Sequence, residues 1–332
     1  METPQIIVDN TPYFLDRSVS EVLLDGKNQK PRKKIAGAFL YEDTTTLLFS
    51  RTNYGKSLIA FQFAWAAATS GHFDPCAALY NECDPMKVLL VDLELESRDI
   101  FERHSSVLFS HNPFQANLRY LHERVDNKMM LGFQLLDKIE QAAIVHSAKL
   151  VIIDNISKLL PDALKAETVT MIIATLNRIR QNTGATILVI GHTTKGNPQV
   201  CIQPTDYFGS SMLQNFFHEL SFLDKTKDGN FFLCHSKTKH KDSFTETVPV
   251  FSRGDHSIVG VGFTFLSLQN LVDIQLPFAL TPATKSRIRN IAQFKKEIEI
   301  LLNNGVTKVD VARMMAVTPR AVRYALINPD YV

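Results

Sequence analysis

The residues with the clearest chemical meaning are Gly55-Lys56-Ser57, which stand between two apolar runs. The run before them, Thr44–Phe49, is β-branched and apolar like a short strand, and the run after them, Leu58–Ala64, has the composition of a helix. Backbone N–H groups at the start of a helix have no partner within it, and the helix dipole favours an anion there. A strand, a polar loop and Gly-Lys-Ser opening a helix form the context of the phosphate-binding signature G-x-x-x-x-G-K-[ST]. The chemistry indicated is the binding of a nucleotide through its phosphates.

The predicted phosphate-binding loop departs from the signature at its first position, where Ser50 replaces glycine. Ser50 would either hold a left-handed backbone conformation, at a strain of about 1–2 kcal/mol, or turn the loop differently. Lys56 would reach the β- and γ-phosphates of ATP, and the hydroxyl of Ser57 would ligate Mg²⁺. The predicted nucleotide-binding residues are Ser50, Arg51, Thr52, Asn53, Tyr54, Gly55, Lys56 and Ser57. The alternative is an ordinary strand–turn–helix in which Gly-Lys-Ser occurs by chance.

Asp154 closes a second apolar run, Lys149–Asp154. Beside a phosphate-binding loop, a carboxylate at this strand end would hold the Mg²⁺ shell through water, whereas a turn former or a helix cap is the alternative. The next residue is Asn155, at a position where many ATPases place a glutamate to orient the attacking water. If the protein hydrolyses ATP, the base must therefore come from another element.

Glu94 is predicted to be that base, because it closes the run Lys87–Glu94 at the same edge of the expected sheet. Asp92 and Glu96 compete with it, but only a residue at the carboxyl end of a strand reaches the nucleotide. A solvated acidic strand end is the alternative. His192 follows a third apolar run, where it could sense the γ-phosphate and couple it to the following loop, or simply be satisfied at a strand end.

The elements that must position these residues alternate between strand and helix from about residue 37 to 195. Further strands are predicted at 87–94, 149–154 and 185–190, and helices at 133–147, at roughly 167–182 with Gly184 as its C-cap, and after an N-cap at Ser97. Apolar strands that alternate with helices imply a parallel sheet covered on both faces. The ligand is then expected at the carboxyl ends of the strands.

Beyond residue 195 the pattern changes. Residues 196–209 are rich in glycine, proline and polar residues and are predicted to form a mobile loop. Short strands follow at 219–223, 230–235, 247–253 and 258–266, which indicates an antiparallel meander added to the sheet. The predicted fold class is α/β, with a mostly parallel twisted sheet, helices on both faces and this meander.

The chain is predicted to have four parts. Residues 1–36 form a polar arm, whose basic stretch 27–34 could contact phosphates or a neighbouring subunit or could simply be solvated. Residues 37–266 form the α/β domain, residues 267–289 a linker, and residues 290–332 a small all-α domain.

That last domain has the spacing of a helix-turn-helix. Thr318 as N-cap and Pro319 at the first helical position favour a helix start. Arg320 and Arg323 would then lie on the recognition helix, towards the phosphates or base edges of DNA. Generic helical hairpins share much of this pattern, and such units can also bind proteins.

Composition limits the class of protein. The chain of 332 residues is 45% hydrophobic and 21% charged, as expected of a soluble globular protein, and its net charge of +2 requires any DNA-binding surface to be local. Four cysteines without a C-x-x-C pair indicate reduced thiols in the cytoplasm. No apolar run approaches the ~20 residues that span a bilayer, and the start is unlike a signal peptide, so we expect a cytoplasmic protein without a membrane partner.

In order along the chain, these motifs resemble those of the RecA-like ATPases, and within them the branch of RepA-like plasmid replicative helicases and DnaB-like proteins. The set comprises the loop at 50–57, the strand ending in Glu94, Leu150–Asp154, and Ile187–His192 followed by Gly209-Ser210-Ser211. The resemblance covers roughly 37–266 and implies the same catalytic role for Glu94. It also implies a Lys-x-Arg pair that reaches the nucleotide of the adjacent subunit, for which this sequence offers Lys237 and Lys239.

Three departures from that branch affect the expected rate. Ser50 replaces a loop glycine, Phe208 stands where an arginine often precedes Gly-Ser-Ser, and Lys239 replaces the finger arginine. Lysine lacks the planar bidentate fork of arginine, and an arginine finger contributes about 10³–10⁵ in rate, so hydrolysis is expected to be slow or to depend on a partner. The two lysines could also be a basic strand edge that prevents edge pairing.

The sequence therefore predicts an ATP-hydrolysing, DNA-associated protein of the plasmid or mobile-element helicase type, which uses ATP and Mg²⁺. We expect a homo-oligomer, such as a hexamer, with ATP at the subunit interfaces and DNA near the 196–209 loop. One alternative is an ATP-dependent DNA-binding regulator or partition protein without helicase activity. The other is a structural module whose altered loop holds no nucleotide.

Overall fold

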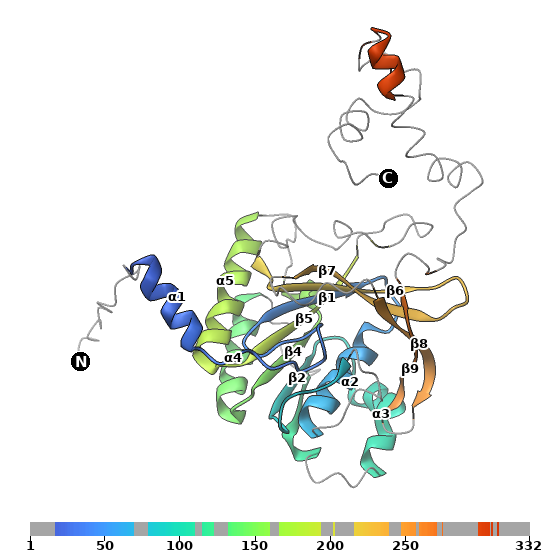
Figure 1. Ribbon diagram of the computed structural model, residues 1–332. Coiled ribbons are helices and arrows are strands. Elements are labelled where there is room, and N and C mark those ends of the chain that lie inside the picture. The colour runs from blue at the N-terminus through green and yellow to red at the C-terminus, as the bar shows by residue number, and fades with distance from the viewer. Residues whose placement is uncertain are drawn as a thin grey trace.

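A computed structural model of the chain (Figure 1) describes residues 17–69, 79–109, 115–122, 132–159, 166–193, 216–238, 247–256, 259–270 and 298–305, and the single residues Ile202, Ile274, Thr307 and Val311. The strands are β1 (Thr45–Ser50), β2 (Val88–Asp92), β3 (Leu118–His122), β4 (Leu150–Asp154), β5 (Thr186–His192), β6 (Glu219–Lys225), β7 (Phe231–Thr238), β8 (Thr247–His256) and β9 (Gly260–Asn270). The α-helices are α1 (Val19–Asn28), α2 (Lys56–Thr69), α3 (Ser97–His104), α4 (Phe133–His146) and α5 (Ala166–Thr183).

All the described strands belong to one sheet, in the order β3-β2-β4-β5-β1-β6-β7-β8-β9. From β3 to β6 the neighbouring strands are parallel. From β6 to β9 they are antiparallel, and this part is the meander predicted from the sequence. The meander therefore extends the parallel sheet at the β1 side, next to the loop that begins α2.

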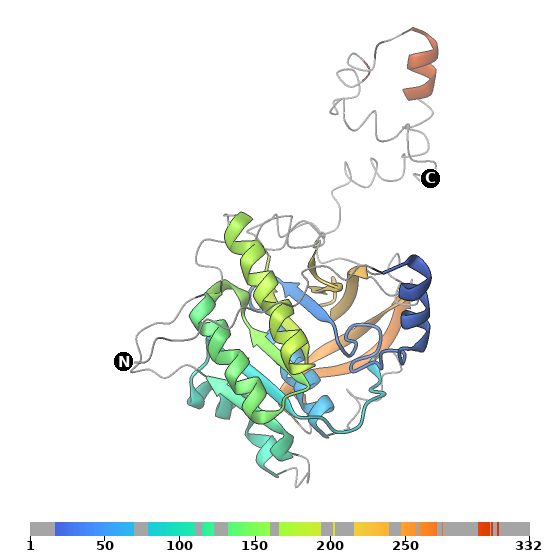
Figure 2. The ribbon, with the colours of Figure 1, turned by 90° about the vertical axis from the view of Figure 1, so that its left-hand side faces the viewer.

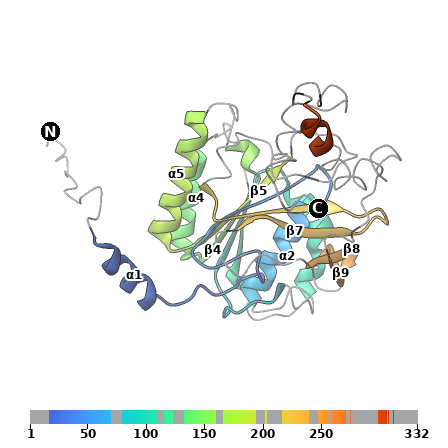
Figure 3. The same ribbon diagram turned by 45° about the horizontal axis from the view of Figure 1, so that its top comes forward.

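The parallel strands are buried on both faces because helices cover each of them. In β4, Val151 and Ile153 belong to the hydrophobic core formed with α4 and α5, and Leu150 and Ile152 belong to the core formed with α2. Successive side chains of a strand point to opposite faces, so one apolar run serves both cores. Figure 2 shows α4 and α5 packed over one face of the sheet, and Figure 3 shows them on the side opposite α2.

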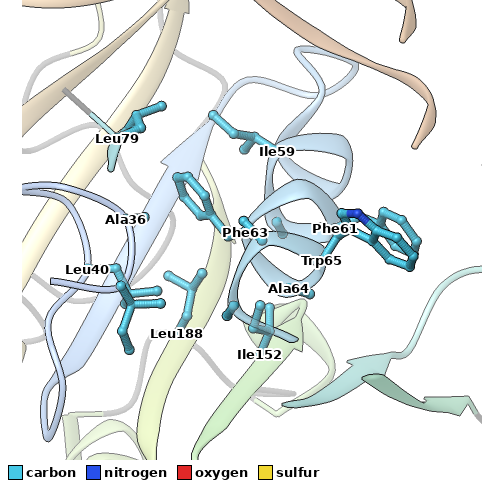
Figure 4. Packing of buried hydrophobic residues seen from close by; sticks show 14 of the residues in the cluster. Ala36, Leu40, Ile59, Phe61, Phe63, Ala64, Trp65, Leu79, Ile152 and Leu188 are labelled. Atoms are coloured by element: carbon cyan, nitrogen blue, oxygen red, sulfur yellow. The ribbon is translucent and has the colours of Figure 1, made fainter. Parts of the chain in front are cut away.

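Helix α2 is buried almost along its whole length, in keeping with its alanine-rich and aromatic sequence. One side packs on the sheet near Ile152 and Leu188, while Phe61 and Trp65 lie on the side away from Leu188 (Figure 4). Phe61 stacks on His104 of α3, with ring centroids 3.7 Å apart. Because α2 is covered on both sides, the residues at its N-terminus have a fixed position relative to the sheet.

A reciprocal contact ties α2 to the meander. The side chain of Gln62 donates from Nε2 to the carbonyl of Phe263 and accepts at Oε1 from its N–H, each at 2.8 Å. The buried amide of Gln62 thus makes the same pair of hydrogen bonds with one residue of β9 that a neighbouring strand would make. β9 is thereby held over the start of α2.

The structure confirms the predicted strands and helices of the α/β domain, with shifted ends. β2 ends at Asp92, so Glu94 lies beyond the strand that it was predicted to close. The N-cap of α3 is Glu96 and not Ser97, because the Glu96 N–H donates to the carboxylate of Asp99 at 3.1 Å. β9 continues to Asn270, inside the predicted linker.

One described strand and one described α-helix were missed. β3 (Leu118–His122) is only partly buried and lacks an apolar alternation, since it is the edge strand. α1 lies in the predicted polar arm, begins with a capping box between Ser18 and Glu21, and buries none of its residues. The arm also ends differently, because Ile35 and Ala36 are buried in the core with α2.

Most of the predicted C-terminal domain lies outside the described residues. Residues 298–303 are helical, and Gly305 follows with φ 81°, as expected for the end of the helix predicted at 294–302. The 196–209 loop, apart from Ile202, is also outside them.

Candidate functional site

Four parallel strands end at one edge of the sheet and bring polar residues together there. In the strand register Ser50 of β1 lies opposite His192 of β5, and Asp92 of β2 lies opposite Asp154 of β4. These are the carboxyl ends of the strands, where open α/β sheets place their ligands. Residues from four separate parts of the sequence therefore surround the start of α2.

The loop between β1 and α2 is not strained at Ser50. This residue ends β1, is fully buried, and donates from Oγ to the carbonyl of Arg51 at 3.0 Å. The left-handed residues of the loop are Asn53 (φ 65°) and Gly55 (φ 91°), two residue types that tolerate this conformation. Of the two possibilities for Ser50, the structure thus shows the second, in which the loop turns differently.

Gly55 is needed at its position for a second reason. A Cβ atom there would lie 2.7 Å from Cζ of Phe263, on β9. The meander therefore lies directly on the loop, and the glycine of Gly-Lys-Ser allows this close approach.

A cavity of about 180 Å³ opens between the loop, the strand ends and the meander. Of the predicted nucleotide-binding residues, Thr52, Asn53, Gly55, Lys56 and Ser57 line it. Ser50, Arg51 and Tyr54 do not, although the carbonyls of Ser50 and Arg51 accept from Lys56. Tyr54 packs instead against Phe231 of β7.

Lys56 is the buried cation of this cavity. Its side chain donates from Nζ to the carbonyls of Ser50 (3.3 Å) and Arg51 (3.0 Å), and the residue is only 5% exposed. Burial lowers the pKa of Lys56 to about 8, against the opposing attraction of Asp154 and Glu94. Because burial disfavours the ammonium form, an anion beside Nζ would stabilise it, which is the behaviour expected of a phosphate-binding lysine.

Asp154 and Ser57 place two oxygen atoms, a carboxylate and a hydroxyl, side by side at the cavity. Asp154 is 5% exposed, and burial raises its pKa to about 6, while a hydrogen bond from Ser57 acts in the other direction. A carboxylate and a hydroxyl side by side are ligands that suit Mg²⁺, which usually takes one or two protein ligands and completes its shell with phosphate oxygens and water. Among the described residues, no larger cluster of His, Cys, Asp or Glu could hold a metal ion by itself.

The three acidic residues around the end of β2 have different surroundings. Asp92 is buried and already accepts hydrogen bonds from the N–H groups of Glu94 and Leu95 and from the hydroxyl of Tyr120. Glu96 is exposed at the start of α3 and does not line the cavity. Glu94 does line it, so it is the one of the three that a bound nucleotide could meet.

Glu94 is held at the cavity by two polar neighbours. Oε1 accepts from Nδ2 of Asn155, and Nε2 of His192 lies 3.8 Å from the same oxygen. A proton on Nε2 of His192, and then the hydrogen bond from Asn155, lower the pKa of Glu94, whereas partial burial opposes them. The carboxylate is therefore ionised at neutral pH, as a proton acceptor must be.

Two arginines that sequence reasoning missed also line the cavity. Arg253 of β8 donates from Nη1 to the carbonyl of Asn53 at 2.8 Å, and Arg103 comes from the end of α3. A Cβ on Gly260 would lie 2.1 Å from the Arg103 carbonyl oxygen, so this glycine lets β9 and α3 approach. No local sequence signal marks either arginine, because only the pairing of β8 with β9 and their packing on α2 and α3 bring them here.

Four other predicted site residues are not placed at the cavity by the described structure. The backbone of Lys237 lies in β7, paired with Leu220, but its side chain is outside the described part. Lys239, Arg320 and Arg323 are outside it altogether, so their roles stay predictions.

Comparison with known proteins decides the family. The AAA domain family matches residues 12–198, more than half of the chain. The chain belongs to this family. A KaiC-like protein from the hyperthermophilic archaeon Pyrococcus horikoshii OT3 has a similar structure, with a TM-score of 0.50 and 17% sequence identity, covering 72% of this chain and 100% of its own. No curated protein sequence matches the chain.

The AAA domain is thus a P-loop ATPase domain, and its similarity to the KaiC-like structure confirms the predicted RecA-like α/β fold. At 17% identity that similarity concerns the fold alone. Within the described residues, no helix is both long and apolar enough to cross a membrane.

Proposed function

We propose that this AAA domain hydrolyses ATP with Mg²⁺, associates with DNA and acts as a homo-oligomer, in the manner of plasmid or mobile-element replicative helicases. The observation that carries the ATPase part is the cavity itself. It combines Lys56 for phosphate, Ser57 and Asp154 for Mg²⁺, and the ionised Glu94 for proton transfer. Lys56 and Ser57 begin α2, Asp154 ends β4 and Glu94 follows β2. An accidental Gly-Lys-Ser would not require Asp154 and Glu94 to face it.

The size of the cavity suits the phosphates alone. Its volume of about 180 Å³ is below the roughly 300–1,000 Å³ typical of pockets that enclose a whole ligand. The base and sugar would then lie outside it. A nucleotide bound at the edge of one subunit is available to a second subunit, which supports the proposed interface sites.

The residues of the chain account for the steps of hydrolysis. Glu94 accepts the proton of the attacking water, whose oxygen bonds to the γ-phosphorus as the bond from that phosphorus to the β–γ bridging oxygen breaks. Lys56 stabilises the charge on the phosphates, and Arg103 and Arg253 supply further positive charge from the same chain. Ser57 and Asp154 would hold Mg²⁺, which would neutralise part of the negative charge of the phosphates.

The DNA part of the proposal is supported by the sequence pattern of the tail and by the resemblance to RepA-like and DnaB-like proteins. We expect single-stranded DNA to raise the ATPase rate at least roughly fivefold, the lower end of typical coupling between two sites. The measurement is phosphate release with and without DNA, on full-length protein whose oligomeric state is determined in parallel by light scattering. A rate that DNA leaves unchanged in every oligomeric state would contradict a DNA-coupled motor.

A regulator or partition protein that uses ATP only as a switch is the second candidate, favoured by Lys239 in place of the finger arginine. Unwinding of a forked duplex separates the two. Helicase action requires unwinding that depends on ATP, whereas a switch protein binds the fork and leaves it paired.

The predicted helix-turn-helix has its own test. Replacing both Arg320 and Arg323 by alanine should weaken DNA binding and lower the slope of log affinity against log salt by about 1 for each lost phosphate contact. ATPase activity without DNA should be retained. A matched control removes two lysines elsewhere, Lys138 and Lys227, both exposed. If the arginine variant binds DNA like the control, the tail binds something other than DNA.

A further inference from the structure

Asn155 contacts both polar residues that flank the cavity at the ends of β2 and β5. It is fully buried, and its Nδ2 donates to Oε1 of Glu94 and lies 3.0 Å from Nε2 of His192. We infer that Asn155 is a positioning residue that holds Glu94 and His192 together as one hydrogen-bonded unit. The inference rests on the proposed hydrolysis of ATP and assigns a role that neither the motif nor the family match specifies.

The orientation of the Asn155 amide follows from a third contact. Its Oδ1 accepts from the backbone N–H of Ser157 at 2.8 Å, in the turn that follows β4. An oxygen at that position is required, since the N–H can only donate. Nδ2 must therefore point the other way, and its two hydrogens match two acceptors, one on Glu94 and one on His192. The amide cannot flip without losing its contacts with Ser157 and Glu94.

His192 is fixed by the same amide. To accept from Asn155, its Nε2 must be unprotonated, so the proton of the neutral ring lies on Nδ1. Nδ1 is buried and has no hydrogen-bond partner among the described residues. Among the described residues, Asn155 is accordingly the hydrogen-bond partner that sets the tautomer of the ring.

The hydrogen bond from Asn155 fixes the orientation of the Glu94 carboxylate. Asn155 occupies Oε1, which leaves Oε2 for a water molecule in the cavity. Many ATPases have a glutamate at the position of Asn155. In this chain, its carboxylate would lie in contact with the carboxylate of Glu94, and two like charges so close together cannot both stay ionised. A neutral donor at position 155 therefore fits a chain whose base comes from position 94.

The unit also links the base to the end of β5. His192 is the last residue of that strand and stands at the start of the segment that leads to the 196–209 loop. A rotation of the His192 ring would remove one acceptor from Asn155 and leave its amide held by Ser157 and Glu94. A movement of the end of β5 would thus loosen the unit that positions the base.

Two variants test the role of Asn155 in the full-length protein. Asn155→Asp keeps the shape and the acceptor for Ser157 but replaces the donor by an oxygen, and Asn155→Ala removes both. We expect kcat to fall by about 10–100-fold in each, as a misplaced catalytic group typically causes, with the Kd for ATP changed less than about threefold. Asn182→Ala, on the exposed face of α5, is the matched control and should keep the wild-type kcat. Circular dichroism and thermal unfolding verify that each variant is folded.

A double-mutant cycle shows whether the residues act as a unit. If they do, His192→Ala combined with Asn155→Ala should lose no more rate than the more damaging single change, whereas independent residues would lose the product of both effects. A folded Asn155→Asp protein with wild-type kcat, or losses that multiply, would overturn the inference. If the wild type itself releases no phosphate, the proposed ATPase fails instead, and this outcome is distinct from a wild-type ATPase that is indifferent to position 155.

Discussion

Glu94→Gln should abolish turnover while leaving ATP bound. The change keeps the shape of the side chain and its contact with Asn155, since an amide oxygen can still accept from Nδ2. It removes the ability to take a proton from water, and a general base contributes about 10²–10⁴ in rate. We therefore expect kcat to drop by that factor and the Kd for ATP to stay within about threefold. Single-turnover phosphate release and titration with a fluorescent ATP analogue measure the two quantities.

Glu96→Gln is the matched control for this variant. It removes one carboxylate from the same acidic stretch, but from an exposed position outside the cavity lining, so it should keep the wild-type rate. Retained hydrolysis in Glu94→Gln would remove Glu94 as the base. A loss in both variants would mean that the negative charge of the whole stretch matters, and not proton transfer at one atom.

Lys56→Ala should have the second largest effect, and it acts on binding. Lys56 is the buried cation of the cavity, and a hydrogen bond between charged groups contributes about 1.5–3 kcal/mol, so ATP affinity should fall by roughly 10–100-fold and turnover should be lost with it. Isothermal titration with ATP and Mg²⁺ measures the affinity. If wild type and variant bind ATP equally weakly, in the millimolar range, the loop is not a nucleotide site. That result would support the alternative of a structural module that holds no nucleotide.

The stability of the Lys56 variant provides an independent check. Burial lowers the pKa of Lys56 from 10.5 to about 8. Without a bound anion, the charged form therefore costs the folded protein stability, and this cost grows as the pH falls from 10.5 to about 8 and is complete below 8. Removal of the ammonium should therefore leave the melting temperature without nucleotide unchanged or higher. Lys138→Ala, at an exposed position of α4, is the control for a lost positive charge and should keep both affinity and turnover. A large fall in melting temperature for Lys56→Ala alone would indicate a structural lysine.

The positive charge around the cavity bears on the expected rate. From the sequence, Lys239 in place of an arginine predicts slow hydrolysis. Arg103 and Arg253, which reach the cavity from the same chain, change this expectation, because an arginine supplied in cis can stabilise the phosphates without a neighbour. Ser50, the other reason to expect a slow enzyme, introduces no backbone strain in the loop.

The sequence by itself determined the parts of this protein that depend on local patterns. Alternating apolar runs and helical spacing predicted the parallel sheet, because a strand buried on both faces must be apolar throughout and a covering helix must have one apolar side. Gly55-Lys56-Ser57 marked the phosphate loop. Asn155, which has no carboxylate, implied that the base comes from another strand end, as predicted for Glu94. The weakly patterned elements, β3 and α1, were missed because an edge strand and a solvated helix bury too little to leave a signal.

Only the tertiary structure decided what surrounds those motifs. The approach of Phe263 to Gly55 and the place of Arg253 at the cavity depend on β8 and β9 folding back over α2, a pairing between residues far apart in sequence. The contacts of Asn155 depend on strands β2, β4 and β5 ending side by side. The periodicity of a sequence specifies which face of a helix or strand is buried, but it does not specify which distant side chain packs against that face. The position of Asn155 between Glu94 and His192 is such a long-range contact.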